Sequence, residues 1–124
     1  MDIIGIGTDI VNIDRIRKIY SRFGKSFLEK NFHTQEIDYF NNLISVDKIP
    51  YLAKRFAGKE AVSKALGTGI GEVAFKDIAI LNNKLGAPYV LIDTPRINYS
   101  KNIKINISLS DEAPFAVAFV VISG

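Results

Sequence analysis

The sequence predicts an α+β domain in which a mostly antiparallel sheet packs on one long helix. Three stretches carry this prediction. Residues 49–66 have apolar and alanine side chains almost all the way round a helical projection, which is typical of a largely buried helix. Residues 104–110 alternate strictly between apolar and polar side chains, as a strand with one buried face does. Residues 115–122 are almost continuously apolar, which predicts a strand buried on both faces.

The first expected strand covers residues 3–11. Gly5 and Gly7 leave one of its faces nearly bare, so another backbone or a ligand can approach that face closely. Asp9 lies on the same bare face, because side chains alternate along a strand.

Helices follow this strand. Capping residues and hydrophobic periodicity predict three short helices and then the long one, with Gly67 just beyond its end. Their expected bounds are residues 15–23 with Asp14 as cap, residues 27–31, residues 35–43 with Thr34 as cap, and residues 49 or 50 to about 66.

The second half of the chain is predicted to consist mainly of strands. Residues 75–81 and 89–92 are expected to pair around a turn at residues 82–88, and residues 104–110 and 115–122 around a turn at 111–114. Residues 93–102 have weak periodicity and are expected to form a loop or a ragged turn.

Composition narrows the class of protein. The 124 residues are expected to form one domain, and 48% of them are hydrophobic, which is enough for a core. No cysteine is present, which excludes disulfides and thiolate metal sites. Neither a membrane span nor a signal peptide is expected, so a cytosolic location fits. The net charge of +3 permits an acidic partner or a polyphosphate ligand without pointing to nucleic acid.

Glu60 and Lys64 form the first candidate site, because residues four apart share a helix face. They lie on a flank of the long helix with Ala53 and Ala57, which favours a cleft over bulk water. A carboxylate suits Mg²⁺, and a lysine beside it suits phosphates. An ordinary surface ion pair is the simpler alternative for Glu60 and Lys64. Asp9 could likewise simply end its strand and cap a turn. Against this, a carboxylate on a glycine-lined strand face would be desolvated, which is costly unless the group is paired or binds a metal.

The glycines after the long helix also have two interpretations. Gly67, Gly69 and Gly71 could be a helix cap and a flexible loop, or they could present backbone N–H groups to a phosphate. His33 is the only histidine, and its neighbours in the sequence offer no serine–histidine–acid arrangement, so we expect a structural or surface role.

The helix at residues 15–23 is strongly cationic on one side. Arg15, Lys18 and Arg22 share that side at helical spacing. Beside them runs an apolar stripe of Ile16, Ile19 and Phe23. Such a helix is either a solvated face or a surface that receives an acidic, amphipathic partner helix.

Three stretches in this sequence match a known family. They are GIGTDIVNIDRI at residues 5–16, RFAGKEAVSKALGTGIG at residues 55–71, and ISLSDE at residues 107–112 followed by FAVA at residues 115–118. On these motifs the chain resembles the holo-[acyl-carrier-protein] synthases, the small type of 4′-phosphopantetheinyl transferase. The turn at residues 86–88 resembles the family's Gly-x-Pro. Asp111 departs from the histidine that many members have, and an aspartate cannot give a phosphate a cationic contact.

The resemblance implies a 4′-phosphopantetheinyl transferase-like fold and an activity in fatty acid biosynthesis. Family members move the phosphopantetheine arm of coenzyme A to a serine of acyl carrier protein and release adenosine 3′,5′-bisphosphate. Asp9 and Glu60 match the Mg²⁺ ligands, and Lys64 matches the residue that meets the phosphates. Glu60 or a water on the metal could take the serine proton, and the sequence leaves both open. Further expected coenzyme A contacts are Arg55, Ser63, Gly67, Pro88 near the adenine, and the position of Asp111.

The resemblance also implies two kinds of protein partner. Arg15, Lys18 and Arg22 become the docking face for the acidic carrier protein, and the enzyme is expected to be a homotrimer with active sites shared between subunits. Two alternatives are a non-catalytic module that binds coenzyme A or a nucleotide, and a small nucleic-acid-binding domain. The second is disfavoured because Phe75, Phe115 and Phe119 fall in apolar runs that look like core.

Overall fold

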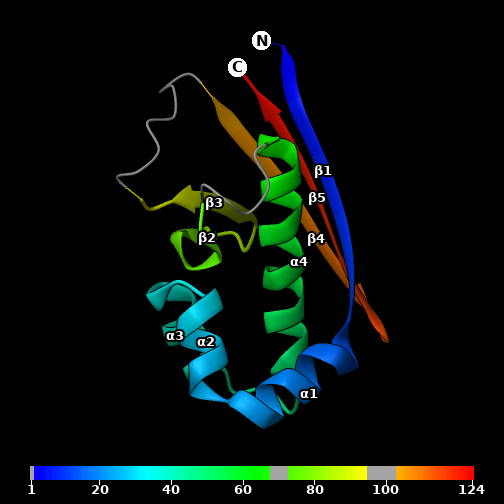
Figure 1. The fold of residues 1–124 in the computed structure, drawn as a ribbon, viewed down its shortest axis with the longest axis vertical. Helices are drawn as coiled ribbons and strands as arrows, with labels where there is room; N and C mark the ends of the chain where they lie inside the picture. Colours follow the sequence, from blue (N-terminus) through cyan, green and yellow to red (C-terminus); the bar gives the residue numbers. More distant parts are fainter. Residues whose placement is uncertain (1, 68–72, 95–102) are drawn as a thin grey trace.

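The computed structural model describes residues 2–67, 73–94 and 103–124 (Figure 1). One strand leads into four helices, and a short 3₁₀ turn and four strands follow. In order these are β1 Ile3–Asn12, α1 Ile13–Phe23, α2 Lys25–Asn31, α3 Thr34–Asn41, α4 Ile49–Leu66, η1 Phe75–Asp77, β2 Ile78–Asn82, β3 Pro88–Ile92, β4 Lys104–Glu112 and β5 Phe115–Ser123. The loop predicted at residues 93–102 lies mostly outside the described residues.

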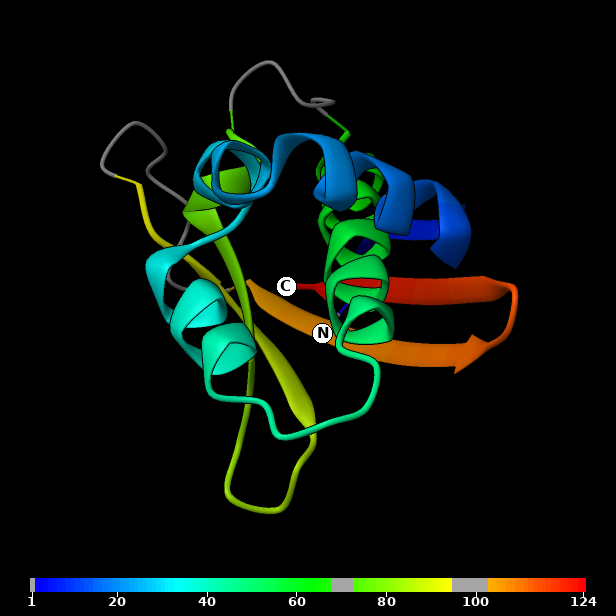
Figure 2. The same ribbon diagram turned by 90° about the horizontal axis from the view of Figure 1, so that it is seen from below.

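The strands form two antiparallel units. β1, β5 and β4 make a three-stranded sheet in that order, and β2 and β3 make a separate hairpin. α4 runs along the three-stranded sheet (Figure 1). Figure 2 shows α1 on one side of α4 and the β2–β3 hairpin with α3 on the other. The predicted α+β class, with antiparallel strands packed on one long helix, is confirmed.

The glycines of β1 let α4 approach the strand at backbone distance. A Cβ atom on Gly5 would lie 2.0 Å from the carbonyl oxygen of Ala65, and one on Gly7 would lie 2.0 Å from that of Ala61. No side chain fits such a gap, so the bare face of β1 is filled by the backbone of α4. This contact fixes Asp9 beside the last two turns of the helix.

Small side chains continue this close packing across the sheet. The face of α4 that meets the sheet carries buried alanines. The facing side of β5 carries Ala116, Ala118 and Val120, which are all fully buried. α4 is buried along most of its length, as its apolar surround predicts. Its predicted bounds are also confirmed, with Gly67 as the C-cap in a left-handed conformation.

Two predicted helix caps are wrong by one or two positions. α1 begins at Ile13 and is capped by Asn12, whose side-chain oxygen accepts from the amide of Asp14 at 2.9 Å. α3 is capped by His33, whose Nδ1 accepts from the amide of Gln35 at 3.1 Å. Asparagine caps as well as aspartate, so sequence preference alone could not choose between neighbours. The Nε2 of His33 pairs with Asp93 at 2.8 Å, so both ring nitrogens are engaged and the predicted structural role is confirmed.

Two strand predictions also need correction. Residues 75–77 form a 3₁₀ turn, and the strand begins only at Ile78. The carbonyls of Phe75 and Ile78 both accept from the buried ammonium of Lys59. β5 is buried on one face only, since Phe115, Val117 and Phe119 are exposed in the single chain. Within the described residues, no helix is both long and apolar enough to cross a bilayer.

Candidate functional site

Asp9 and Lys64 meet where β1 crosses the end of α4. The Nζ of Lys64 lies 3.2 Å from Oδ1 of Asp9 and donates to the backbone carbonyl of Thr8 at 2.9 Å. The Asp9 side chain is 18% exposed and that of Lys64 is 55% exposed, so the pair lies at the rim of the helix–strand contact. The lysine therefore links the helix to the strand that carries the carboxylate.

Glu60 joins this pair one helical turn earlier. Burial raises the pKa of Glu60 above its usual value, and the negative charge of Asp9 raises it further. The charges of Lys64 and Arg15 oppose that rise. Two carboxylates and two cations thus lie within electrostatic reach, and the second cation comes from α1. The structure brings Asp9, Glu60 and Lys64 together, and Arg15 of α1 lies near enough to lower the pKa of Glu60.

The chemistry of this group suits a hard cation. Two carboxylates that repel each other gain from a positive ion between them. Among the described residues, no group of three or more His, Cys, Asp or Glu side chains could hold a metal. Mg²⁺ does not need such a cage, because it is commonly held by one or two carboxylates, waters and substrate phosphates. Asp9 and Glu60 therefore fit Mg²⁺ that arrives with a phosphate-bearing substrate.

Arg55 does not join this cluster. It lies nine residues before Lys64, so at about 100° per residue the two side chains leave α4 on opposite sides. Arg55 is buried, stacks over the ring of Tyr51 at 4.2 Å and donates to Asn82 at 3.0 Å. It lines a cavity of about 230 Å³ with Tyr39 and Tyr89. Burial lowers the pKa of its guanidinium, which still stays charged.

The other expected coenzyme A contacts are spread over the molecule. Ser63 is buried, and its hydroxyl donates to the carbonyl of Lys59 at 3.0 Å. Gly67 caps α4 at the Lys64 end, whereas Pro88 opens β3 in the separate hairpin. Gly69 and Gly71 lie outside the described residues. One chain therefore presents two separate groups of expected contacts.

Asp111 stands near the end of β4, where it has a cationic partner. Its Oδ1 lies 2.9 Å from the Nζ of Lys54 on α4. The position that lacks the familiar histidine is therefore occupied by an ion pair.

The cationic side of α1 is flanked by an apolar hollow. The guanidinium of Arg22 lies over the ring of Phe23 at 5.2 Å. Phe23 and Ile19 line a cavity of about 340 Å³ that continues onto α2 through Phe27. Arg22 therefore lies beside this hollow through its contact with Phe23, whereas Arg15 and Lys18 do not line it.

The buried ion pair of Lys59 and Glu36 was not predicted from the sequence. The Nζ of Lys59 donates to Oε1 of Glu36 and to the carbonyls of Phe75 and Ile78, and both charged side chains are fully buried. The other oxygen of Glu36 accepts from the amide of Ile80 at 3.0 Å. Burial lowers the pKa of Lys59, and Glu36 opposes this. A lysine on the apolar side of a buried helix is a signal that could have revealed it.

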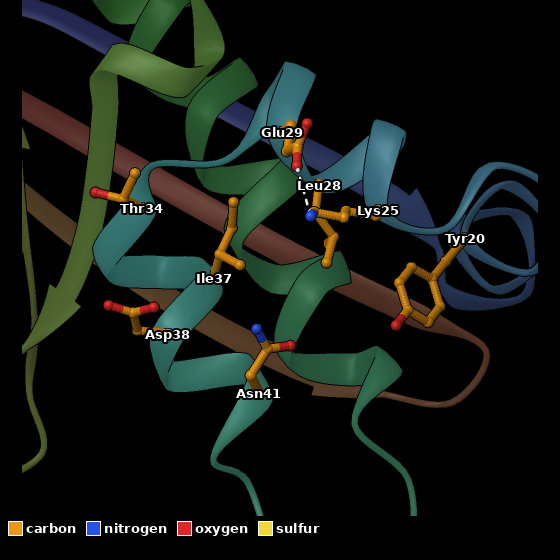
Figure 3. A pocket seen from close by; sticks show the side chains of 8 residues that line it. All are labelled: Tyr20, Lys25, Leu28, Glu29, Thr34, Ile37, Asp38 and Asn41. Carbon is orange, nitrogen blue, oxygen red and sulfur yellow. Dashed lines mark ion pairs between the residues drawn. The ribbon is translucent and has the colours of Figure 1, made fainter.

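A further hollow lies between α2 and α3, away from these groups (Figure 3). It has a volume of about 390 Å³ and contains the ion pair of Lys25 and Glu29 at 3.6 Å. None of the site residues expected from the sequence lines it.

Comparisons with known proteins agree on one family. A family model of the 4′-phosphopantetheinyl transferase superfamily matches residues 5–120. A holo-[acyl-carrier-protein] synthase of Orientia tsutsugamushi (strain Ikeda) is 44% identical, with 98% of this chain and 97% of the relative covered. The crystal structure of the Neisseria meningitidis synthase is similar with a TM-score of 0.85 at 37% identity, covering 99% and 100% of the two chains. The Helicobacter pylori synthase in complex with coenzyme A has a TM-score of 0.82 at 41% identity, covering 95% and 99%.

Proposed function

This chain belongs to the 4′-phosphopantetheinyl transferase superfamily, and on that premise we propose which of its residues carry the reaction. The chain is an enzyme that transfers the 4′-phosphopantetheine group of coenzyme A to a serine of apo-acyl carrier protein. The products are the holo-carrier and adenosine 3′,5′-bisphosphate. The non-catalytic coenzyme A module is set aside, because the relatives that match the whole chain are synthases.

We propose that Asp9 and Glu60 hold a Mg²⁺ ion. The observation that carries this proposal is the pairing of two carboxylates, in which the charge of Asp9 raises the pKa of the half-buried Glu60. When bound, the ion offsets the negative charge of the pyrophosphate and orients it for in-line displacement.

Lys64 is proposed to bind the phosphates of coenzyme A. Its ammonium has three donors, and its position beside Asp9 lets it reach an anion that the carboxylates hold through the metal. Positive charge at this point stabilises the leaving adenosine 3′,5′-bisphosphate, whose charge grows as the bond breaks. Arg15 contributes a second positive charge, because it already acts on Glu60 from α1.

Arg15, Lys18 and Arg22 are proposed to receive the carrier protein. Their charges complement an acidic partner, and the hollow beside Ile19 and Phe23 can take an apolar residue from an amphipathic helix. Because Arg15 also lies near Glu60, docking here would bring the carrier serine close to the metal ligands.

A homotrimer with shared sites is proposed from two features. The outer face of the three-stranded sheet exposes a row of large apolar side chains: Ile4, Ile6, Ile10, Phe115, Val117 and Phe119. Contiguous apolar surface of this kind is typical of an interface. Arg55 and Lys64 leave α4 on opposite sides, so one coenzyme A would reach both only across two subunits. Two further statements remain predictions. They are that residues 1–124 act as one transferase domain and that the enzyme works in the cytoplasm.

The function and the metal site can be tested in one experiment. The protein is incubated with coenzyme A, Mg²⁺ and apo-carrier, and the carrier is weighed by mass spectrometry. We expect the phosphopantetheine mass to be added, and Asp9→Asn and Glu60→Gln each to slow transfer by at least about 100-fold. Glu29→Gln on α2 is the matched control and is expected to leave the rate unchanged.

Binding of Mn²⁺ as a probe separates the metal role from a loss of fold. Asp9→Asn should lose this binding while keeping its thermal midpoint. Near-normal transfer by both carboxylate variants would show that the metal assignment is wrong.

A further inference from the structure

We propose that the buried ion pair of Lys59 and Glu36 positions the walls of the cavity that receives the nucleotide part of coenzyme A. Both are positioning residues, because neither side chain lines that cavity. This role depends on the proposed function, which supplies coenzyme A as the ligand. It accounts for a charged pair at a core position that two apolar side chains could fill equally well.

The nucleotide cavity is the hollow of about 230 Å³ beside Arg55. Its walls come from α3, α4 and the β2–β3 hairpin, which contribute Tyr39, Arg55 and Tyr89 among others. Pro88, the other contact expected near the nucleotide, precedes Tyr89 and pairs with Asn82 across the hairpin. Aromatic walls with few polar groups are suited to a nucleobase.

The ion pair joins the same three elements behind this cavity. The Nζ of Lys59 on α4 donates to Oε1 of Glu36 on α3 and to the carbonyl of Ile78 at the start of β2. Oε2 of Glu36 accepts from the amide of Ile80 at 3.0 Å, and Ile80 itself lines the cavity. The hydroxyl of Tyr51, another wall residue, donates to the backbone carbonyl of Glu36 at 3.2 Å. The pair therefore acts on the cavity through residues that form its walls.

Two successive contacts fix how β2 lies along α4. Lys59 holds the strand at Ile78, and one helical turn earlier Arg55 donates to Asn82 at 3.0 Å. Hydrogen bonds that involve a charged group are short and strong, so both contacts limit sliding of the hairpin. Without Lys59, only the contact at the open end of the cavity would hold β2 to the helix in this way.

The metal ligands are aligned by a different contact. Asp9 lies on β1, which meets α4 where Gly7 packs on the backbone of Ala61. Lys59 contacts α3 and the start of β2, so loosening its ion pair leaves the approach of β1 to Glu60 intact. We therefore expect binding of the nucleotide to suffer and the chemical step to be preserved.

The test replaces the ion pair by two apolar side chains. The double variant Lys59→Met with Glu36→Leu leaves no buried charge, and such replacements are often neutral or stabilising. It removes the hydrogen bonds to β2, so the cavity walls must be ordered when the ligand binds. We expect a melting midpoint above that of Lys59→Met, a KM for coenzyme A raised about tenfold, and a kcat and a carrier KM within a factor of two. The Kd of adenosine 3′,5′-bisphosphate, measured by calorimetry, should rise by the same factor as the KM.

A second variant and a control complete the experiment, with all rates measured well below every melting midpoint. Glu36→Gln keeps the shape of the side chain, but its single acceptor oxygen can serve Lys59 or Ile80 and not both. It should raise the KM for coenzyme A in the same direction and keep kcat, even if the double variant folds poorly. Arg17→Met is the matched control, because it removes an ion pair of 2.7 Å with Asp47 that does not line the cavity. It should leave the KM for coenzyme A unchanged.

Two results would overturn the inference. A wild-type KM for coenzyme A in both the double variant and Glu36→Gln would make the ion pair a matter of stability alone. A kcat that falls as much as the KM rises, or more, would show that the pair acts on the whole enzyme or on Glu60 beside it in the chain. The proposed function fails separately, if the wild-type enzyme does not modify the carrier.

Discussion

The contact between Gly7 and the backbone of α4 can be tested by replacing Gly7 with alanine. The added methyl would lie 2.0 Å from the carbonyl oxygen of Ala61 and 2.9 Å from the amide nitrogen of Ala65. Ordinary contact begins near 3.4 Å, so the helix must move away by roughly 1.4 Å or the strand must bend. Neither neighbour is a flexible side-chain end, which places the cost at the upper end of overpacking, about 3 kcal/mol.

Alanine also restricts the unfolded chain, which returns about 0.4–1 kcal/mol. The net loss of unfolding free energy is therefore about 2 kcal/mol, or on the order of 8 °C in the melting midpoint for a chain of this size. The effect on catalysis should be larger. Asp9 lies on β1, and Glu60 and Lys64 lie on α4, so moving the helix pulls the site apart. Displacement of about 1 Å at reacting groups can cost on the order of 100-fold in rate.

The assay measures carrier modification by mass spectrometry at a temperature well below both melting midpoints. Gly58→Ala is the matched control, because it also adds a methyl to a buried glycine of α4. There the nearest atoms are side-chain methyl groups of Ile80 and Ile107, which can turn aside, and alanine favours the helix by about 0.5–1 kcal/mol. We expect near wild-type transfer from Gly58→Ala. If Gly7→Ala kept the wild-type melting midpoint and a rate within threefold, the close contact would not be what aligns the site.

Three further predictions concern the surfaces and the buried ion pair. Lys18→Glu should raise the KM for the carrier at least about tenfold, because it reverses a charge facing an acidic partner, while coenzyme A binding measured by calorimetry stays unchanged; an unaltered carrier KM would defeat the docking proposal. Phe119→Glu should shift the mass measured by light scattering from a trimer to a single chain, because the exposed sheet face becomes charged, and a trimer that persists would place the interface elsewhere. Lys59→Met should cost about 3–5 kcal/mol in chemical unfolding, because Glu36 is left charged and unpaired. The double variant with Glu36→Leu should be more stable than Lys59→Met alone, and equal losses would argue against a paired buried charge.

Local signals along the chain were enough to predict the secondary structure and the chemical types of the side chains at the site. The apolar surround of residues 49–66 and Gly67 beyond them fixed the long helix and its end, because both signals act within a few turns. Gly5 and Gly7 predicted that another backbone or a ligand approaches β1 closely, because no other residue leaves a strand face bare. The spacing of Glu60 and Lys64 placed a carboxylate and an ammonium on one side of the helix.

Which of these groups meet depends on how the helices and strands pack together, and no local signal predicted it. Arg15 acts on Glu60 across two elements, Lys59 pairs with Glu36, and Lys54 pairs with Asp111. The partners in each case are tens of residues apart, and periodicity within one element carries no information about its neighbours. The same packing separated Arg55 from Lys64, although both lie on one helix, because nine residues turn a side chain to the opposite face. The meeting of Asp9 with Lys64 depends on how closely β1 and α4 approach, and that distance is a property of the packed backbone.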